Sequence, residues 1–384
     1  MRICHVITRL IIGGAQENTL LTCEGLQAAG HDVTLISGPT DGPEGSLVER
    51  ARRGGYRFVE LQSLVRAVDP MRDAAAFFAL KREFRRLTPE IVHTHSSKAG
   101  ILARFAAAAA RVPVVVHTIH GMSFNRTQSA GTRRVYSTLE RLAARRTQCV
   151  ITVADAMIEQ TVAAGVCPRE KMCTIYSGME VERFERRLYD RAAVRGAWGF
   201  PEDAVVVGSV ARLFRNKGYE QLIPIMADAA GREPRLRFVW VGDGAQRGEY
   251  EAQLRGLGLL DRVHFVGLVP PGEIPRLMAG FDILAHASQW EGLPRAVVQA
   301  LLMEVPAVAF AIDGTPEVVL SGKTGFAVPL NDRRAFAEAL LVLAGSRENR
   351  EAFGSAGRKL CLERFDWRRM VNEIEGAYRR LLPG

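Results

Sequence analysis

Short apolar segments alternate with segments of helical pattern along almost the whole chain, and this alternation constrains the fold more than any other feature. An apolar segment at residues 3–7 precedes a helical pattern at 15–28, and another apolar segment follows at 33–36. Such alternation is typical of parallel sheets whose strands are joined by right-handed helical crossovers. The other segments predicted as strands are 91–93, 114–118, 150–153, 205–210, 238–241, 263–266, 283–286 and 307–310.

The alternation lapses into a charged stretch at residues 182–198 and then restarts, which predicts two domains. We expect two Rossmann-like domains, at 1–181 and 182–365, with ligands bound in a cleft at the carboxyl ends of their strands. Residues 366–384 should form a helix that crosses back to the first domain. Its apolar stripe at helical spacing consists of Trp367, Met370, Val371, Ile374, Tyr378 and Leu381.

The sequence lacks the features of several other protein classes. Its opening has no basic segment followed by a long apolar stretch, and no apolar run reaches the about 20 residues of a spanning helix. We therefore expect a cytoplasmic protein. The six cysteines form no C-x-x-C pair, which argues against a zinc or redox motif and favours reduced, mostly buried thiols.

The net charge of +9 is concentrated in the first half of the chain. Residues 1–190 contain 26 Lys or Arg and 19 Asp or Glu, a net +7, which leaves 25 and 23, a net +2, for the rest. A basic half is compatible with nucleic acid, anionic lipid or a phosphorylated substrate. Because stacking aromatic residues are not interleaved with the basic ones, we expect no nucleic-acid partner.

Residues 71–87 make a membrane surface a candidate partner. Phe77, Leu80, Phe84 and Leu87 recur there at helical spacing among five basic residues. A basic amphipathic helix can lie at an anionic lipid interface. The alternative is that the apolar stripe packs on the parallel sheet and leaves a solvated basic face.

The segment VARLFRNKG at residues 210–218 predicts a pyrophosphate site. Arg212 and Lys217 follow a strand that ends at about Val210, in a loop that leads into a helix. A helix N-terminus offers unpaired N–H groups, Arg binds two oxygens at once, and Lys adds a mobile charge. The alternative reading of this segment alone is a solvated basic loop.

The segment EGLPRAVVQA at residues 291–300 predicts a second polar site at a strand-to-helix loop. Glu291 stands at the entrance of the helix, and Gln299 follows eight residues later, a little more than two turns. A carboxylate there can bind sugar hydroxyls, and the amide can meet a ribose. Alternatively, the acid only complements the helix dipole and the glutamine is structural.

Taken together, these segments resemble retaining glycosyltransferases of the GT-B fold, in glycosyltransferase family 4. The resemblance also includes VGDG at 241–244, VHFVG at 263–267 and DGTPEVV at 313–319. In the first half it includes GGAQ at 13–16, HTHSSKAG at 93–100 and HTIHG at 117–121. It covers essentially the whole chain. It implies a hexosyltransferase that uses a nucleotide-diphosphate sugar, needs no metal or other cofactor, and works in polysaccharide or cell-envelope glycan biosynthesis.

The resemblance implies specific roles for residues of the second half. Arg212 and Lys217 would bind the donor diphosphate and stabilise the charge of the leaving nucleotide. Glu291 would hold hydroxyls of the transferred sugar, and the backbone at Leu293 would contact the sugar or phosphate. Gly242, in the VGDG segment, is also assigned to donor binding.

In the first half, the resemblance implies roles for one glycine and two histidines. Gly14 would allow the donor to approach closely, because glycine has no side chain. His120 would lie near the primary hydroxyl of the sugar. His95 would line the acceptor side, where a saccharide or lipid-linked acceptor binds.

The remaining histidines receive less specific interpretations. His5, His31, His264 and His286 are expected to be structural or surface residues. His93 and His95 alternate as a metal pair would, but no Asp or Glu with suitable spacing follows, so we expect no metal site.

One departure from the family keeps two alternatives open. The family signature is E-x7-E, and this chain has Gln299 at its second position, where an amide can still accept and donate hydrogen bonds. A non-catalytic sugar-nucleotide-binding subunit therefore remains an alternative, as does a sugar-nucleotide epimerase of the same architecture. A dinucleotide enzyme is not expected, because Gly13 and Gly14 do not complete G-x-G-x-x-G.

Overall fold

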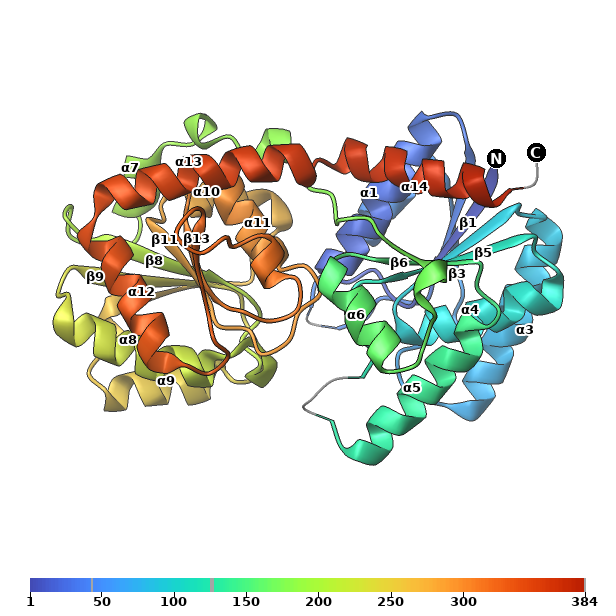
Figure 1. The fold of residues 1–384 in the computed structure, drawn as a ribbon, viewed down its shortest axis with the longest axis horizontal. Helices are drawn as coiled ribbons and strands as arrows, with labels where there is room; N and C mark the ends of the chain where they lie inside the picture. Colours follow the sequence, from blue (N-terminus) through green and yellow to red (C-terminus); the bar gives the residue numbers. More distant parts are fainter. Residues whose placement is uncertain (43, 125–127, 383–384) are drawn as a thin grey trace. The chain divides into compact units, whose positions relative to one another are not determined.

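The computed structural model describes residues 1–42, 44–124 and 128–382 and divides into two compact units. The first unit comprises Met1–Met179 together with Trp367–Gly384, and the second comprises Glu180–Asp366. Figure 1 shows each unit as a sheet with helices around it, and it shows that the last helix belongs with the blue and green elements.

The first unit is built on a seven-stranded parallel sheet with the order β3-β2-β1-β4-β5-β6-β7. The order reverses between β1 and β4, and open parallel sheets bind ligands beyond the carboxyl ends of their strands at such a reversal. The strands are β1 (Arg2–Ile7), β2 (Asp32–Ser37), β3 (Arg57–Glu60), β4 (Ile91–His95), β5 (Val114–Ile119), β6 (Cys149–Thr152) and β7 (Met172–Thr174).

Helices cover both faces of this sheet because side chains alternate along each strand. On one face, Ile3 and Ile7 of β1 belong to a core with residues of α1 and α14. On the other face, Cys4 and Val6 belong to a core with residues of α3 and α4. The helices are α1 (Gly14–Ala28), α2 (Val48–Arg53), α3 (Pro70–Leu87), α4 (Ser97–Ala110), α5 (Ala130–Ala144), α6 (Asp155–Ala163) and α14 (Trp367–Leu381), with a 3-10 turn, η1 (Arg169–Lys171).

The second unit contains a six-stranded parallel sheet with the order β10-β9-β8-β11-β12-β13, which reverses between β8 and β11. Its strands are β8 (Val205–Val210), β9 (Leu236–Val241), β10 (Val263–Gly267), β11 (Ile283–His286), β12 (Ala307–Phe310) and β13 (Gly325–Val328). Its α-helices are α7 (Arg191–Gly196), α8 (Tyr219–Arg232), α9 (Arg247–Gly256), α10 (Ile274–Ala279), α11 (Arg295–Leu302), α12 (Arg333–Gly345) and α13 (Arg347–Arg364). Its 3-10 turns are η2 (Val181–Arg183), η3 (Arg186–Leu188), η4 (Arg215–Lys217), η5 (Leu260–Arg262), η6 (Pro271–Glu273) and η7 (Thr315–Glu317).

The structure confirms the two parallel-sheet units and adds three strands to those predicted. The added strands β3, β7 and β13 all lie at sheet edges. Edge strands bury less side-chain surface, so their sequences RFVE, MCT and GFAV carry a weak apolar pattern.

Helix α3 uses its apolar stripe to pack on the sheet. Leu80 and Phe84 are buried in the core, and Phe77 and Leu87 pack against it. Of the two interpretations of residues 71–87, packing of the apolar stripe on the parallel sheet is therefore correct. Among the described residues, no helix has the length and apolar character needed to cross a bilayer.

Candidate active site

The predicted donor residues of the second unit follow the two strands at which its sheet order reverses. Arg212 and Lys217 lie between β8 and α8, with Lys217 at the end of the turn η4. Glu291 follows β11, which pairs with β8. Because carboxyl ends of adjacent parallel strands meet at one edge of a sheet, residues 74 positions apart in sequence come into contact there.

Lys217 and Glu291 form an ion pair. The Lys217 Nζ lies 2.7 Å from the Glu291 Oε1, and their side chains are only 20% and 14% exposed. The His286 Nε2 lies 3.3 Å from the same oxygen, although the two atoms are not hydrogen-bonded. One carboxylate oxygen therefore faces two nitrogens, and the ammonium keeps two further N–H groups that can reach phosphate.

The electrostatics of this cluster keep Glu291 ionised. Burial by itself raises the pKa of the Glu291 carboxyl, but the charge of Lys217 and the proximity of His286 outweigh it, and the net pKa lies well below its ordinary value. An ionised carboxylate is a hydrogen-bond acceptor only. Glu291 is therefore suited to bind hydroxyl groups rather than to donate a proton.

Two glycines bring the loops of this site close together. Gly218, at the N-terminus of α8, has a φ of +76°, and a Cβ there would lie 1.8 Å from the Ala287 carbonyl oxygen. Gly242, at the end of β9, has a φ of +132°, and a Cβ there would lie 2.2 Å from the Ala211 carbonyl oxygen. Any other residue at either position would push apart the loops that carry Arg212, Lys217 and Glu291.

Four other residues of this unit were also predicted to bind the donor. Arg212 stacks on the Phe214 ring, with its guanidinium carbon 5.0 Å from the ring centroid. Leu293 is 5% exposed and lies in the turn before α11, and Gln299 is a half-buried residue within α11. The Gly242 N–H donates to the Gly267 carbonyl, so it is already engaged.

The predicted residues of the first unit also follow strands. Gly14 is the first residue of α1, after β1, and among the described residues no side chain caps this helix. His95 ends β4, and His120 follows β5. The His95 Nδ1 lies 3.0 Å from the His120 Nε2. The His95 side chain has no exposed surface. Its predicted place on the acceptor side stays a prediction, and direct contact would require the buried ring to become exposed.

Two residues of the Glu291 cluster, His286 and Asp313, are not evident from the sequence. His286 was expected to be structural or a surface residue, yet it is the last residue of β11 and faces Glu291. Asp313 was only part of a matching segment, and its Oδ2 accepts the Glu291 N–H at 2.8 Å. For His286, its position at the end of a strand beside the reversal of the sheet was a usable signal. Asp313 could not be linked to Glu291 from the sequence, because the two residues are 22 positions apart.

Known families match both halves of the chain. The family described as "Glycosyltransferase Family 4" matches residues 12–183, and "Glycosyl transferases group 1" matches residues 190–360. The putative glycosyltransferase EpsD of Bacillus subtilis is 30% identical over 315 residues, 81% of either protein. A UDP-galactose:N-acetylglucosaminyl-diphosphoundecaprenol α-1,3-galactosyltransferase of Escherichia coli is 28% identical over 349 residues, 89% of this chain and 87% of that protein.

Solved structures agree on the fold. Anabaena HepE in complex with UDP and glucose superposes with a TM-score of 0.85 at 21% identity, covering 99% of this chain and all of that one. Sucrose-phosphate synthase of Thermosynechococcus elongatus superposes with a TM-score of 0.81 at 22% identity, covering 99% of each. Similarity at this level of identity establishes the GT-B fold.

The chain belongs to the group 1 glycosyltransferases and has the GT-B fold. It is an enzyme that transfers a sugar from a nucleotide sugar.

Proposed function

We propose that this enzyme transfers a hexose with retention of configuration, without a metal ion, to a saccharide or lipid-linked acceptor in cell-envelope glycan assembly. The observation that carries the proposal is the Lys217–Glu291 pair at the reversal of the second sheet. It offers a cation for the donor diphosphate and a carboxylate for the sugar hydroxyls side by side.

Each proposed role follows from the chemistry of the side chain. Arg212 and Lys217 bind the diphosphate, and their charges stabilise the nucleoside diphosphate as it leaves. Glu291 accepts hydrogen bonds from hydroxyls of the transferred sugar, and Gln299 contacts the ribose. His120 contacts the primary hydroxyl of the sugar.

Retention without an enzyme nucleophile requires attack on the face from which the nucleotide leaves. The bond between the anomeric carbon and the phosphate oxygen breaks, and the acceptor oxygen bonds to the same carbon. The acceptor proton moves to an oxygen of the departing phosphate. No metal is needed for this step, because Arg212 and Lys217 supply the positive charge.

The relatives support the choice of donor and acceptor. The E. coli relative uses a UDP sugar and a saccharide linked to diphosphoundecaprenol, and HepE binds UDP and glucose. A capsular polysaccharide glycosyltransferase of Staphylococcus aureus is 22% identical over 85% of this chain. We therefore infer a nucleotide sugar of the UDP type and a diphosphate-linked lipid acceptor.

A donor screen followed by a transfer assay tests this proposal. Thermal shift with a panel of nucleotide sugars selects the donor, because a ligand at 100 times its Kd adds about 2.7 kcal/mol of stability. The selected donor is then incubated with a polyprenyl-diphosphate-linked saccharide, and the new linkage is examined by NMR. We expect an acceptor-linked product with the anomeric configuration of the donor. An inverted product, a free epimerised sugar nucleotide, or binding without turnover would contradict the proposal.

Helix α5 provides a surface that fits an anionic membrane carrying such an acceptor. Val135, Leu139 and Leu142 recur at helical spacing and are 59%, 37% and 41% exposed. The single acidic residue of the helix, Glu140, is buried against Arg104. The exposed basic residues in and after this helix are Arg133, Arg134, Arg141, Arg145 and Arg146. The apolar side chains insert between the lipids while the basic side chains are attracted to the anionic headgroups, and both contributions bind an amphipathic helix to a membrane surface.

Liposome sedimentation distinguishes this surface from the basic face of α3. We expect binding to anionic vesicles that decreases with salt, falls on replacing Val135, Leu139 and Leu142 by Ser, and is also weakened by Arg133→Glu with Arg134→Glu. The matched control replaces Arg82, Arg85 and Arg86 of α3 by Glu and should have the smaller effect, since the apolar stripe of α3 is buried. Absence of binding at low salt, or an equal loss in the α3 control, would contradict the assignment to α5.

A further inference from the structure

Two cysteines on neighbouring strands of the first unit lie in contact, although they are 24 positions apart in sequence. Cys149 is the first residue of β6, and Cys173 is the middle residue of β7, the strand that pairs with β6. Their sulfur atoms are 3.7 Å apart and share a hydrogen bond. The register places Cys173 opposite Ile151, so Cys149 is its diagonal neighbour on the same face of the sheet. We name Cys149 and Cys173 the thiol pair.

The thiol pair differs from the other cysteines in its access to solvent. The four other cysteines are buried and at most 4% exposed, whereas both members of the thiol pair are half-buried. A small uncharged oxidant such as a hydroperoxide therefore reaches these two sulfur atoms more readily than the others. Access to solvent is one of the two properties that make a cysteine sensitive to oxidation, and thiolate character is the other.

The surroundings of Cys173 favour its thiolate. The hydrogen bond with Cys149 lowers the pKa of the Cys173 thiol, and the charge of Arg380 on α14 acts in the same direction, while burial and Glu373 oppose the shift without reversing it. The same hydrogen bond, together with burial, raises the pKa of Cys149. Because the thiolate is the nucleophile in sulfur chemistry, Cys173 is suited to attack first, and Cys149 keeps its proton.

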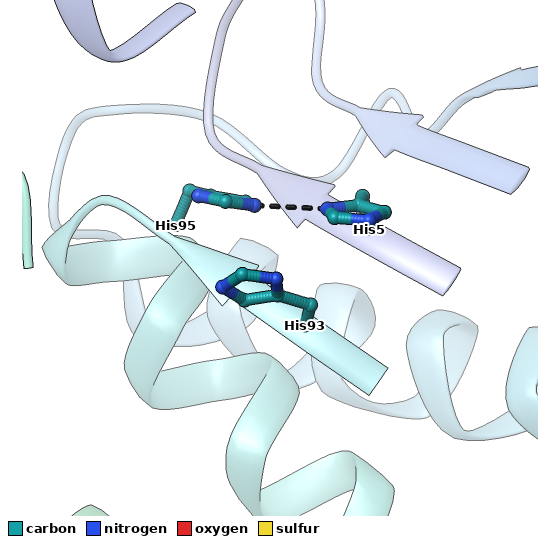
Figure 2. Close-up of side chains that lie close together, drawn as sticks. All are labelled: His5, His93 and His95. Atoms are coloured by element: carbon teal, nitrogen blue, oxygen red, sulfur yellow. Dashed lines mark hydrogen bonds between the residues drawn. The ribbon is translucent and has the colours of Figure 1, made fainter. Parts of the chain in front are cut away.

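A metal site is the competing interpretation of two thiols in contact. A structural zinc takes four ligands from cysteine, histidine or acidic side chains. Among the residues that the structure describes, one group of three or more such side chains is close enough to share an ion, namely His5, His93 and His95, which Figure 2 shows on β1 and β4. Neither strand pairs with β6 or β7, so in the described part of the chain no third ligand of these types joins the thiol pair.

We propose that the thiol pair is a redox-modification site, at which a hydroperoxide oxidises Cys173 and Cys149 then closes a reversible disulfide. The Cys173 thiolate attacks one oxygen of the hydroperoxide, so that an S–O bond forms, the O–O bond breaks, and the leaving oxygen takes a proton from solvent. The Cys149 sulfur next attacks the Cys173 sulfenic acid, so that the S–S bond forms, the S–O bond breaks, and the hydroxide leaves as water with the Cys149 proton. Two electrons pass from the two thiols to the hydroperoxide.

Strand β7 is placed to allow this closure. The sulfur atoms must approach from 3.7 Å to the about 2.05 Å of a disulfide. Because β7 is a three-residue edge strand that pairs with β6 alone, it can shift without breaking a second ladder. It is also the last strand before the chain leaves the first unit after Met179, so oxidation would tie this exit covalently to β6. Disulfides of this kind in cytosolic proteins are usually transient and redox-sensing.

Peptide mapping by mass spectrometry after treatment with H₂O₂ tests the proposal. Remaining thiols are alkylated, and the peptides are compared with and without dithiothreitol. In wild type we expect one disulfide, between Cys149 and Cys173, that dithiothreitol reverses. In Cys149→Ser the sulfenic acid of Cys173 has no partner, so it should proceed to sulfinic and sulfonic acid, which dithiothreitol does not reverse. In Cys173→Ser, Cys149 should stay reduced at the same dose.

Cys167→Ser is the matched control. It removes a buried thiol of the same unit, so the disulfide should form as in wild type. If the variants of the thiol pair do not fold, the wild-type map decides alone. Wild-type protein without a Cys149–Cys173 disulfide, or with buried cysteines oxidised first, would overturn the proposal. Rapid oxidation of Cys149 in Cys173→Ser would overturn the assignment of Cys173 as the attacking thiol. One equivalent of Zn²⁺ that protects both thiols from alkylation would replace the proposal with a metal site.

Discussion

Replacing Lys217 by Met isolates the ion pair at the centre of the candidate active site. Met keeps the length of the side chain and removes the charge that lies 2.7 Å from the Glu291 Oε1. Breaking a fully buried pair costs about 3–5 kcal/mol, and an exposed pair contributes about 0–1 kcal/mol. Side chains that are 20% and 14% exposed lie between these limits, so we expect a loss of about 2 kcal/mol.

The loss should depend on pH, because it acts through the ionisation of Glu291. In wild type the pKa of this carboxyl lies below its unfolded value of about 4.3, so its contribution is present above that pH and is lost only in stronger acid. Without Lys217, burial is opposed only by His286, so the pKa of the carboxyl rises and the variant has less of this contribution than wild type. The difference between the two proteins should therefore be larger near pH 7 than near pH 4, and it should disappear only in stronger acid.

Scanning calorimetry measures this difference. For a unit of this size, about 2 kcal/mol corresponds to a lower Tm of about 4–8 °C at pH 7. The exposed Lys323→Met is the matched control and should leave Tm unchanged. Glu291→Gln completes a double-mutant cycle, in which the pair should show a coupling of about 1 kcal/mol or more. A Tm difference that does not vary with pH, or a coupling of zero, would refute the reasoning.

Three further predictions concern the activity. Arg212→Ala should weaken nucleoside diphosphate binding about tenfold to a hundredfold, since charge-assisted hydrogen bonds contribute about 1.5–3 kcal/mol; unchanged affinity by calorimetry would contradict the diphosphate role. Transfer should survive EDTA because Arg212 and Lys217 carry the charge, and a complete loss that Mg²⁺ or Mn²⁺ restores would show otherwise. Gln299→Glu should keep transfer while Glu291→Ala lowers kcat more than nucleotide affinity; an inactive but folded Gln299→Glu protein would argue against the ribose role.

The strand pattern predicted the fold well where strands are buried on both faces. The segments at 205–210 and 283–286 became β8 and β11 with the predicted bounds, because central strands of parallel sheets are continuously apolar. Three edge strands, β3, β7 and β13, escaped detection, whereas the edge strand β10 was predicted, so edge position weakens the apolar pattern without always hiding it. The amphipathic pattern of residues 71–87 was real, but a helical stripe does not reveal whether it faces a sheet or a lipid.

The candidate site was predicted residue by residue but not as a set of contacts. The sequence suggested separate roles for Lys217 and Glu291, and the structure joins them in one ion pair. His5 had no distinguishing neighbour in sequence, because its partner His95 comes from another strand, whereas His286 ends the strand that Glu291 follows. Pairing of side chains across strands depends on register and strand order, which a linear pattern does not contain.

The path of the chain also sets an order in which the protein can fold during synthesis. The second unit is inserted between two parts of the first, and the core on one face of the first sheet includes Met370, Ile374 and Tyr378 of α14. A ribosome releases these residues only after all of Glu180–Asp366. The first sheet therefore emerges with one face only partly covered, by α1 without α14, and with the His93 Nδ1 lacking its Tyr378 partner, while the second unit has all its residues earlier. We expect the inserted unit to fold to completion first, although it begins later in the sequence, and the first unit to need protection from aggregation until α14 docks.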